Sequence, residues 1–67
     1  MEIFTIYKNP LDYPDSFVLR RFKLNVPDTD PVLVCSTLTA ARAAVPDDKT
    51  YFPRDKSDHY CVVESWI

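Results

Sequence analysis

The chain has 67 residues, of which ten are acidic, eight are basic and none is glycine. The resulting net charge of −2 argues against the concentrated basic face that nucleic-acid binding requires. Without glycine, the chain lacks the residue that phosphate-cradling loops and nucleophile elbows need for their sharp backbone turns. Length and composition together predict one globular domain, residues 1–67.

The first half of the chain predicts two paired strands. Residues 2–7 alternate in the manner of a strand, and residues 17–24 form a second run rich in strand-forming types. The segment between them, residues 8–15, holds two prolines together with Asn and Asp, which are turn formers. We therefore expect an antiparallel pair of strands joined by a stiff connection.

After a loop at residues 25–31, the pattern predicts a third strand at 32–35 followed by a short helix. Ser36 or Thr37 can cap this helix, because a hydroxyl at that position accepts a hydrogen bond from a free backbone N–H. The helix ends before Pro46, since proline disfavours helical geometry in the residue before it. The apolar stripe of the helix consists of Leu38, Ala41 and Val45, with Thr39 and Arg42 facing outward.

The remaining residues predict a polar loop and a last strand. Residues 47–58 are loop-like, with residues 51–53 as an anchor onto the core, and residues 60–67 form the strand. The order is then β-β-β-α-β, and the fold class is α+β: a small, mainly antiparallel sheet of three or four strands with one short helix on one face. The second face must therefore be partly exposed, covered by other residues or used for binding.

We expect the core to combine the apolar positions that face the helix. The expected core residues are Phe4, Ile6, Val18, Phe22, Val34, Leu38, Ala41, Val45, Val62 and Trp66. Side chains of opposite parity then form the second face, because successive residues of a strand point to opposite sides. These are Ile3, Thr5 and Tyr7 on the first strand, with Phe17, Leu19 and Arg21 on the second.

Few side chains offer catalytic or metal-binding chemistry. His59 with Asp55 and Asp58 matches no recognised ligand geometry, so we expect a solvated loop and no metal. The serines have only this one histidine as a potential partner, so we expect no hydrolytic triad. The sequence therefore predicts no catalytic residue, no cofactor and no enzyme.

One carboxylate and two thiols lie among apolar neighbours. Glu64 stands in the last strand, where we expect it to pair with Arg20 or Arg21 across strands. Cys35 and Cys61 both lie in apolar, strand-like runs, which is typical of buried thiols. A bond between the two cysteines and a reactive role for either are the alternatives.

No targeting or membrane-spanning segment is expected. Residues 1–7 lack the basic region with which a signal peptide starts. The longest apolar stretches, such as residues 32–35, are far shorter than the roughly 20 residues that span a bilayer. We therefore expect a cytoplasmic protein.

The second face and the proline-stiffened connection together offer a surface for a partner. Aromatic and Arg side chains are enriched at protein interfaces, and a stiff loop loses little entropy on binding. The candidate partner-binding residues are Tyr7, Leu11, Tyr13, Phe17, Leu19 and Arg21. Two alternatives stay open: residues 51–53 fold over this face as a lid, or two copies of the chain meet there or at an open strand edge as a homodimer.

Three segments carry a resemblance. They are Ile-Tyr-x-Asn-Pro-x-Asp-Tyr-Pro-Asp-x-Phe-Val-x-Arg-Arg at residues 6–21, the helical segment at 36–46, and Val-Val-Glu-Ser-Trp-Ile at 62–67. The chain resembles a family of short bacterial and phage hypothetical proteins with a Tyr-Asp-x-Pro-x-Asp-Tyr-Pro-like start and a Val-Glu-x-Trp-like end, from which Asn9 departs. The resemblance implies a small protein of bacterial or mobile-element origin, and it carries over no catalytic residue.

These observations favour a non-enzymatic protein-binding module. A stoichiometric inhibitor of a host factor is one form of this hypothesis, by analogy with small acidic phage proteins. The alternative is a nucleic-acid-associated regulator, suggested faintly by Arg20, Arg21 and Lys23 among aromatic residues. A small enzyme is the third hypothesis.

Overall fold

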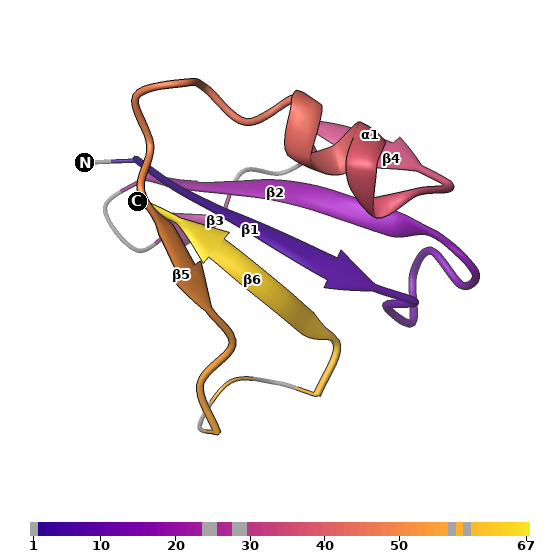
Figure 1. Ribbon diagram of the computed structural model, residues 1–67. Coiled ribbons are helices and arrows are strands. Elements are labelled where there is room, and N and C mark those ends of the chain that lie inside the picture. Colours follow the sequence, from indigo (N-terminus) through magenta and orange to yellow (C-terminus); the bar gives the residue numbers. More distant parts are fainter. Residues whose placement is uncertain (1, 24–25, 28–29, 57, 59) are drawn as a thin grey trace.

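The computed structural model describes residues 2–23, 26–27, 30–56, 58 and 60–67 (Figure 1). Six strands and one helix lie in these described ranges. In chain order they are β1 (Glu2–Lys8), β2 (Phe17–Lys23), β3 (Val26–Pro27), β4 (Leu33–Cys35), α1 (Leu38–Ala43), β5 (Tyr51–Pro53) and β6 (Val62–Trp66). The strands form one antiparallel sheet in the order β3-β2-β1-β6-β5, with β4 also paired to β2.

The two short strands β3 and β4 pair with different parts of β2. β3 pairs with Phe22 and Lys23, whereas β4 pairs with residues 17–19, so both lie on the edge of β2 away from β1. Together they act as one interrupted edge strand. The expected α+β class with one short helix is therefore confirmed, and the sheet is slightly larger than the three or four strands that we expected.

Two of these strands lie inside segments that the sequence predicts as loops. β3 falls within residues 25–31, and β5 falls within residues 47–58. Each is only two or three residues long, and each contains a proline. Strands this short are held by pairing with a neighbour rather than by a periodic pattern of their own, so the local sequence does not reveal them.

α1 begins and ends as the sequence predicts. Thr37 is the N-cap, and its Oγ1 accepts a hydrogen bond from the backbone N–H of Ala40 at 3.2 Å. The last helical residue is Ala43, three positions before Pro46. Ala41 is fully buried on the sheet, and its small side chain lets the helix lie close.

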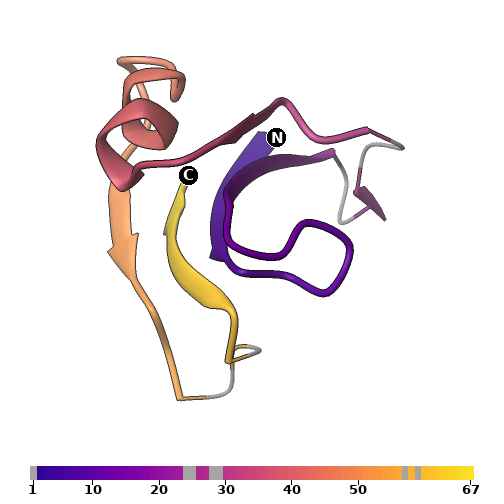
Figure 2. The same cartoon turned by 90° about the vertical axis from the view of Figure 1, so that its right-hand side faces the viewer.

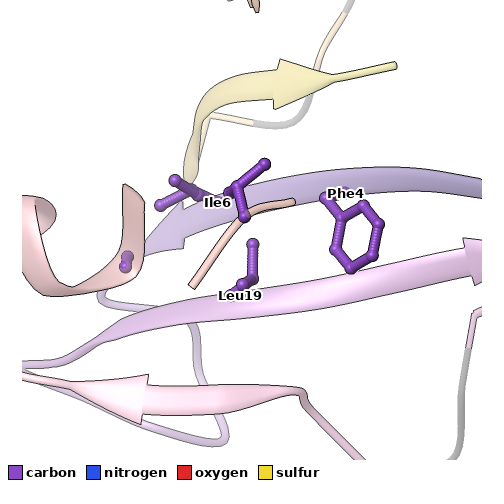
Figure 3. Close-up of a cluster of buried hydrophobic side chains, with 5 residues drawn as sticks. Phe4, Ile6 and Leu19 are labelled. Atoms are coloured by element: carbon purple, nitrogen blue, oxygen red, sulfur yellow. The ribbon is translucent and has the colours of Figure 1, made fainter. Parts of the chain in front are cut away.

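The main core lies between α1 and the sheet. It is built around the buried residues Phe4, Ile6, Leu19, Ala41 and Val45 (Figure 3). Phe17, Leu33, Cys35, Leu38, Val63 and Trp66 pack against this cluster. Leu38 and Ala41 of the expected stripe face the core from the helix, and Val45 is buried in the same cluster but follows the end of α1. The placement of Phe4 and Ile6 beneath the helix is confirmed.

The expected face assignment of β2 is wrong. Ile6 stands opposite Leu19, so Leu19 lies under α1 together with Phe17, whereas Val18 and Phe22 lie on the other face. Val34, expected in the core, is exposed. Residues 17–19 are all apolar, so alternation alone does not say which of them faces the helix, and the pairing with β1 decides.

The connection between β1 and β2, residues 9–16, lies on the side of the sheet away from α1 (Figure 2). Its ends are joined by a hydrogen bond from the Asn9 N–H to the Ser16 carbonyl oxygen at 2.8 Å. Asn9 and Asp15 take left-handed backbone angles, with φ of 53° and 62°. Asn and Asp tolerate this conformation better than other non-glycine residues, which is how a chain without glycine makes this turn.

β6 contains an irregularity between Val62 and Glu64. Ile6 pairs with Glu64, but the next residue, Tyr7, pairs with Val62, so Val63 is an extra residue in the ladder. Glu64 therefore shares the α1 side of the sheet with Ile6, while Val62 shares the other side with Tyr7. Glu64 lies beneath the helix with Trp66 by ordinary alternation, and the extra residue moves Val62, which we expected in the core beneath the helix, to the other side.

Candidate functional site

Glu64 is the buried charged residue among the described positions, with 1% of its side chain exposed. Its carboxylate accepts hydrogen bonds from Arg42 Nε at 3.0 Å and from Arg42 Nη2 at 2.7 Å. It also accepts one from Trp66 Nε1 at 2.7 Å. We name this group the carboxylate clamp: Arg42, Glu64 and Trp66. It ties α1 to β6.

The clamp holds Glu64 in its ionised form. Burial alone would raise the pKa of the Glu64 carboxyl, but the hydrogen bonds from Arg42 and Trp66 and the charge of Arg42 outweigh burial and lower it. The same hydrogen bond raises the pKa of the Arg42 guanidinium. A carboxylate with both oxygens occupied and almost no exposed surface is not placed to exchange protons with a substrate. The clamp therefore serves the fold.

The partner that we expected for Glu64 is wrong. Arg20 contacts Asp12, with Nη2 and Oδ2 2.7 Å apart, and Arg21 Nη1 lies 3.4 Å from Glu2 Oε2. Arg42, which we expected to face outward, supplies the partner instead. The pattern of the strands alone does not show this contact, because the position of α1 over the sheet creates it.

Asp55 and Asp58, in the segment before β6, hydrogen-bond to each other. The Asp55 N–H donates to Asp58 Oδ2 at 2.9 Å, and the Asp58 N–H donates to the Asp55 carbonyl oxygen at 3.0 Å. His59 lies outside the described residues. Within the described part of the chain, no three His, Cys, Asp or Glu side chains gather in a group that could hold a metal ion.

The two cysteines are thiols and not a disulfide. Cys61 is buried, and its Sγ lies 3.7 Å from the Asn9 carbonyl oxygen. Cys35 is half-buried, and its Sγ lies 3.3 Å from the Thr37 carbonyl oxygen. Both thiols therefore contact backbone oxygens, as small buried side chains do.

The structure divides the six candidate partner-binding residues among three locations. Phe17 and Leu19 lie in the core under α1, and Leu19 is 0% exposed, so a partner cannot reach it in this fold. Arg21 lies on the same side of the sheet as Leu19 and is half-buried. Tyr7, Leu11 and Tyr13 belong to the opposite side or to the connection that runs along it.

Tyr7 and Leu11 differ greatly in accessibility. Burial raises the pKa of the Tyr7 hydroxyl above its ordinary value, and the Asp58 carboxylate adds to this while Arg20 opposes it. The Leu11 side chain is 91% exposed at the tip of the connection. Of the six candidates, Leu11 thus offers the most accessible apolar surface, but it stands apart from the strands.

A second group of apolar side chains lies on the sheet side away from α1. Strand alternation places Phe22 beside Ile3 on this side, and Phe52 beside Ser65. Ile67 continues the ladder through reciprocal hydrogen bonds with Thr50 and follows Trp66 on the opposite side. We name this group the open face: Ile3, Phe22, Phe52 and Ile67, which lie beside the Thr5–Ser65 hydroxyl pair (3.3 Å).

The lid that we considered for residues 51–53 does not form. This segment is β5, which extends the sheet beside β6 instead of folding over it (Figures 1 and 2). Its ring at position 51 packs edge-on against Trp66, with ring centroids 5.3 Å apart, and Phe52 is 47% exposed. Phe52 was expected to anchor onto the core and is instead a surface residue, although an aromatic pair ended by Pro53 is a signal of an edge strand.

In comparisons with known proteins, no family model, no curated protein and no solved structure matches the chain. Within the described ranges, no helix has the length and hydrophobicity needed to cross a membrane. What remains to indicate a function is the exposed and charged side chains on the two faces of the sheet.

Proposed function

We propose that this chain is a non-enzymatic protein-binding module and that the open face is its interface. The observation that carries the proposal is the apolar surface that Phe52 and Ile67 expose beside half-buried Ile3 and Phe22. Clustered exposed apolar groups rimmed by polar side chains are typical of interaction sites.

The arrangement of charged side chains supports the same proposal. An enzyme needs an accessible acid, base or nucleophile beside a place where a substrate can sit. The most buried carboxylate, Glu64, is occupied by Arg42 and Trp66 in holding α1 to the sheet. The Glu64 carboxylate therefore stabilises the fold. The open face is the feature of the described residues that the fold does not explain.

A nucleic-acid role has less support. Arg20 and Arg21 point to opposite sides of β2, and each lies beside an acidic side chain, Asp12 and Glu2 respectively. A nucleic acid would have to compete with these carboxylates for both arginines. Nucleic-acid binding is one of the outcomes that affinity capture with salt washes can reveal.

The proposal includes a cytoplasmic location and, as one form, inhibition of a host factor. The inhibitor form rests on the resemblance to short bacterial and phage proteins, which stays a prediction. It requires a stoichiometric complex with one host protein.

The proposal is tested by affinity capture from a lysate of the source organism, followed by mass spectrometry. The immobilised wild-type chain is compared with the double variant Phe52→Asp/Ile67→Asp, which places charge on the open face. Leu11→Asp is the matched control, because Leu11 is even more exposed but lies on the connection. We expect the wild type and the control to retain one partner, and the double variant to lose on the order of 90% of it.

Washing the captured material with salt distinguishes a protein partner from a nucleic acid. An apolar interface keeps its partner in about 0.5 M salt, whereas a nucleic-acid complex weakens steeply with salt. Capture of nucleic acid that disappears in salt would overturn the proposal in favour of the regulator. Equal capture by the wild type and the double variant would show that the open face is not the interface.

A further inference from the structure

β5 is an outer strand of the sheet, and its backbone shows which groups face outward. Thr50 and Ile67 exchange reciprocal hydrogen bonds, 2.7 Å from the Thr50 N–H and 2.9 Å from the Ile67 N–H. In an antiparallel pair such hydrogen-bonded positions alternate with positions that point away from the partner strand. Phe52 is therefore bonded to β6, whereas the backbone groups of Tyr51 and Pro53 point outward.

The outward edge has an unequal set of hydrogen-bonding groups. Tyr51 offers one N–H and one carbonyl oxygen, whereas Pro53 offers only a carbonyl oxygen, because proline has no N–H. Among the described residues, β5 has no strand on its outer side. The edge thus presents two acceptors and one donor to an incoming chain.

Aromatic side chains flank this edge on both sides of the sheet. Tyr51 lies on the α1 side against Trp66 and is 48% exposed. Phe52 lies on the side of the open face and is almost equally exposed. A strand added beside β5 would cover part of both rings, and such cross-strand contacts with aromatic side chains stabilise sheets.

The outward backbone groups of β5 disfavour a second copy of the chain as the strand that binds at this edge. An antiparallel self-pair centred on Tyr51 places Pro53 opposite Lys49 of the other copy. Pro53 has no N–H to give, and the Lys49 N–H already donates to the Pro46 carbonyl oxygen at 3.3 Å. Two copies would therefore form only the two bonds at Tyr51, whereas a foreign strand can also donate to the Pro53 carbonyl oxygen.

We propose that the β5 edge binds an extended segment of a partner protein by strand addition, with Tyr51 as the central hydrogen-bonding position. The segment carries β-branched or aromatic side chains, which pack on the Tyr51 and Phe52 rings from the two sides. The opposite edge of the sheet is a poorer template, because β3 and β4 are separated by residues 28–32. This inference rests on the protein-binding function proposed above and adds the form of the partner.

The decisive variant is the full chain with an N-methylated Tyr51, which is accessible by chemical synthesis at a length of 67 residues. The methyl group removes the one outward donor and obstructs the edge while keeping the ring. The probes are peptides selected on the folded wild-type chain from a random dodecapeptide library displayed on phage. We expect the N-methylated chain to unfold at the wild-type denaturant concentration and to bind these peptides at least tenfold more weakly.

Two further variants complete the test. Phe52→Ala should weaken peptide binding several-fold, because it removes one of the two rings, whereas Leu11→Ala should leave it unchanged. Peptides that bind the N-methylated chain as tightly as the wild type would overturn the inference, and so would a library that yields no binder. A dimer of the wild-type chain that the methyl group dissociates would show that a second copy occupies the edge.

The result also separates this inference from the function on which it rests. A captured protein partner that is lost with Phe52→Asp/Ile67→Asp but retained by the N-methylated chain leaves the protein-binding function standing and refutes strand addition. Loss with both variants supports strand addition at the β5 edge.

Discussion

The two faces of the sheet use alternate residues of the same strands, but they are closed by different means. On one side, α1 covers an apolar cluster that includes Ile6 and Leu19, and the clamp ties the helix to β6. On the other side, residues 9–16 lie along only part of the sheet, and the open face remains accessible (Figure 2). Val18 and Val62 are buried on this second side as well, so only the part of it that carries the open face is available to a partner.

Two ion pairs of equal length, one on each side of the sheet, differ in the same way. Arg42 Nη2 lies 2.7 Å from Glu64 Oε1 on the helix-covered side, and Arg20 Nη2 lies 2.7 Å from Asp12 Oδ2 on the other side. The Glu64 carboxylate is withdrawn from water, whereas the Asp12 carboxylate is exposed. Distance is therefore a poor guide to the energetic weight of these pairs, and burial is the better one.

The largest expected effect comes from the core of the helix-covered side. Leu19→Ala should lower the free energy of unfolding by about 2–5 kcal/mol, because it removes a fully buried side chain and leaves a cavity. Leu11→Ala, the same substitution at an exposed position, should change it by less than about 0.5 kcal/mol. Urea denaturation followed by Trp66 fluorescence measures both, and equal effects would contradict the comparison.

Breaking the clamp should have the next largest effect. Arg42→Met leaves the buried Glu64 carboxylate without its main partner, and we expect a loss in the free energy of unfolding that is smaller than that of Leu19→Ala and larger than that of Asp12→Asn. Replacing both partners, as in Arg42→Met/Glu64→Met, should recover part of this loss, because no charge is then left buried. A double variant less stable than Arg42→Met would contradict this account.

The clamp also predicts a dependence of stability on pH. The pKa of Glu64 is lower in the folded chain than its ordinary value of 4.5, so its contribution is present above that value. The contribution is lost as the pH falls through the folded pKa, because protonation removes the charge that Arg42 and Trp66 hold. Between about pH 7 and about pH 3, the denaturation midpoint should fall further for the wild type than for Glu64→Gln. Parallel curves would argue against the clamp.

The smallest effect is expected at the exposed ion pair. Asp12→Asn should change the free energy of unfolding by about 0–1 kcal/mol, because water and salt screen the contact with Arg20. The change should shrink further in about 1 M salt. A loss as large as that of Arg42→Met would show that the connection stabilises the fold as strongly as the clamp does.

The candidate site was predictable only in part. Residues 17–19 are all apolar, so the sequence indicates a strand there but does not show that Leu19, and not Val18, faces the helix. Placing Leu19 on the side of the sheet away from the helix was wrong for this reason. The sequence did not predict that Phe52 lies on an exposed strand, because β5 is only three residues long and forms by pairing with β6.

The sequence by itself determined the features that depend on a few neighbouring residues. These are the α+β class, the strands β1, β2 and β6, and the helix between Thr37 and Pro46, because alternation, capping and proline act over short distances. Only the tertiary structure decided the register between β1 and β2, the partner of Glu64 and the open edge at β5. Each of these depends on contacts between residues far apart in the chain, where a shift of one position moves every side chain to the other face.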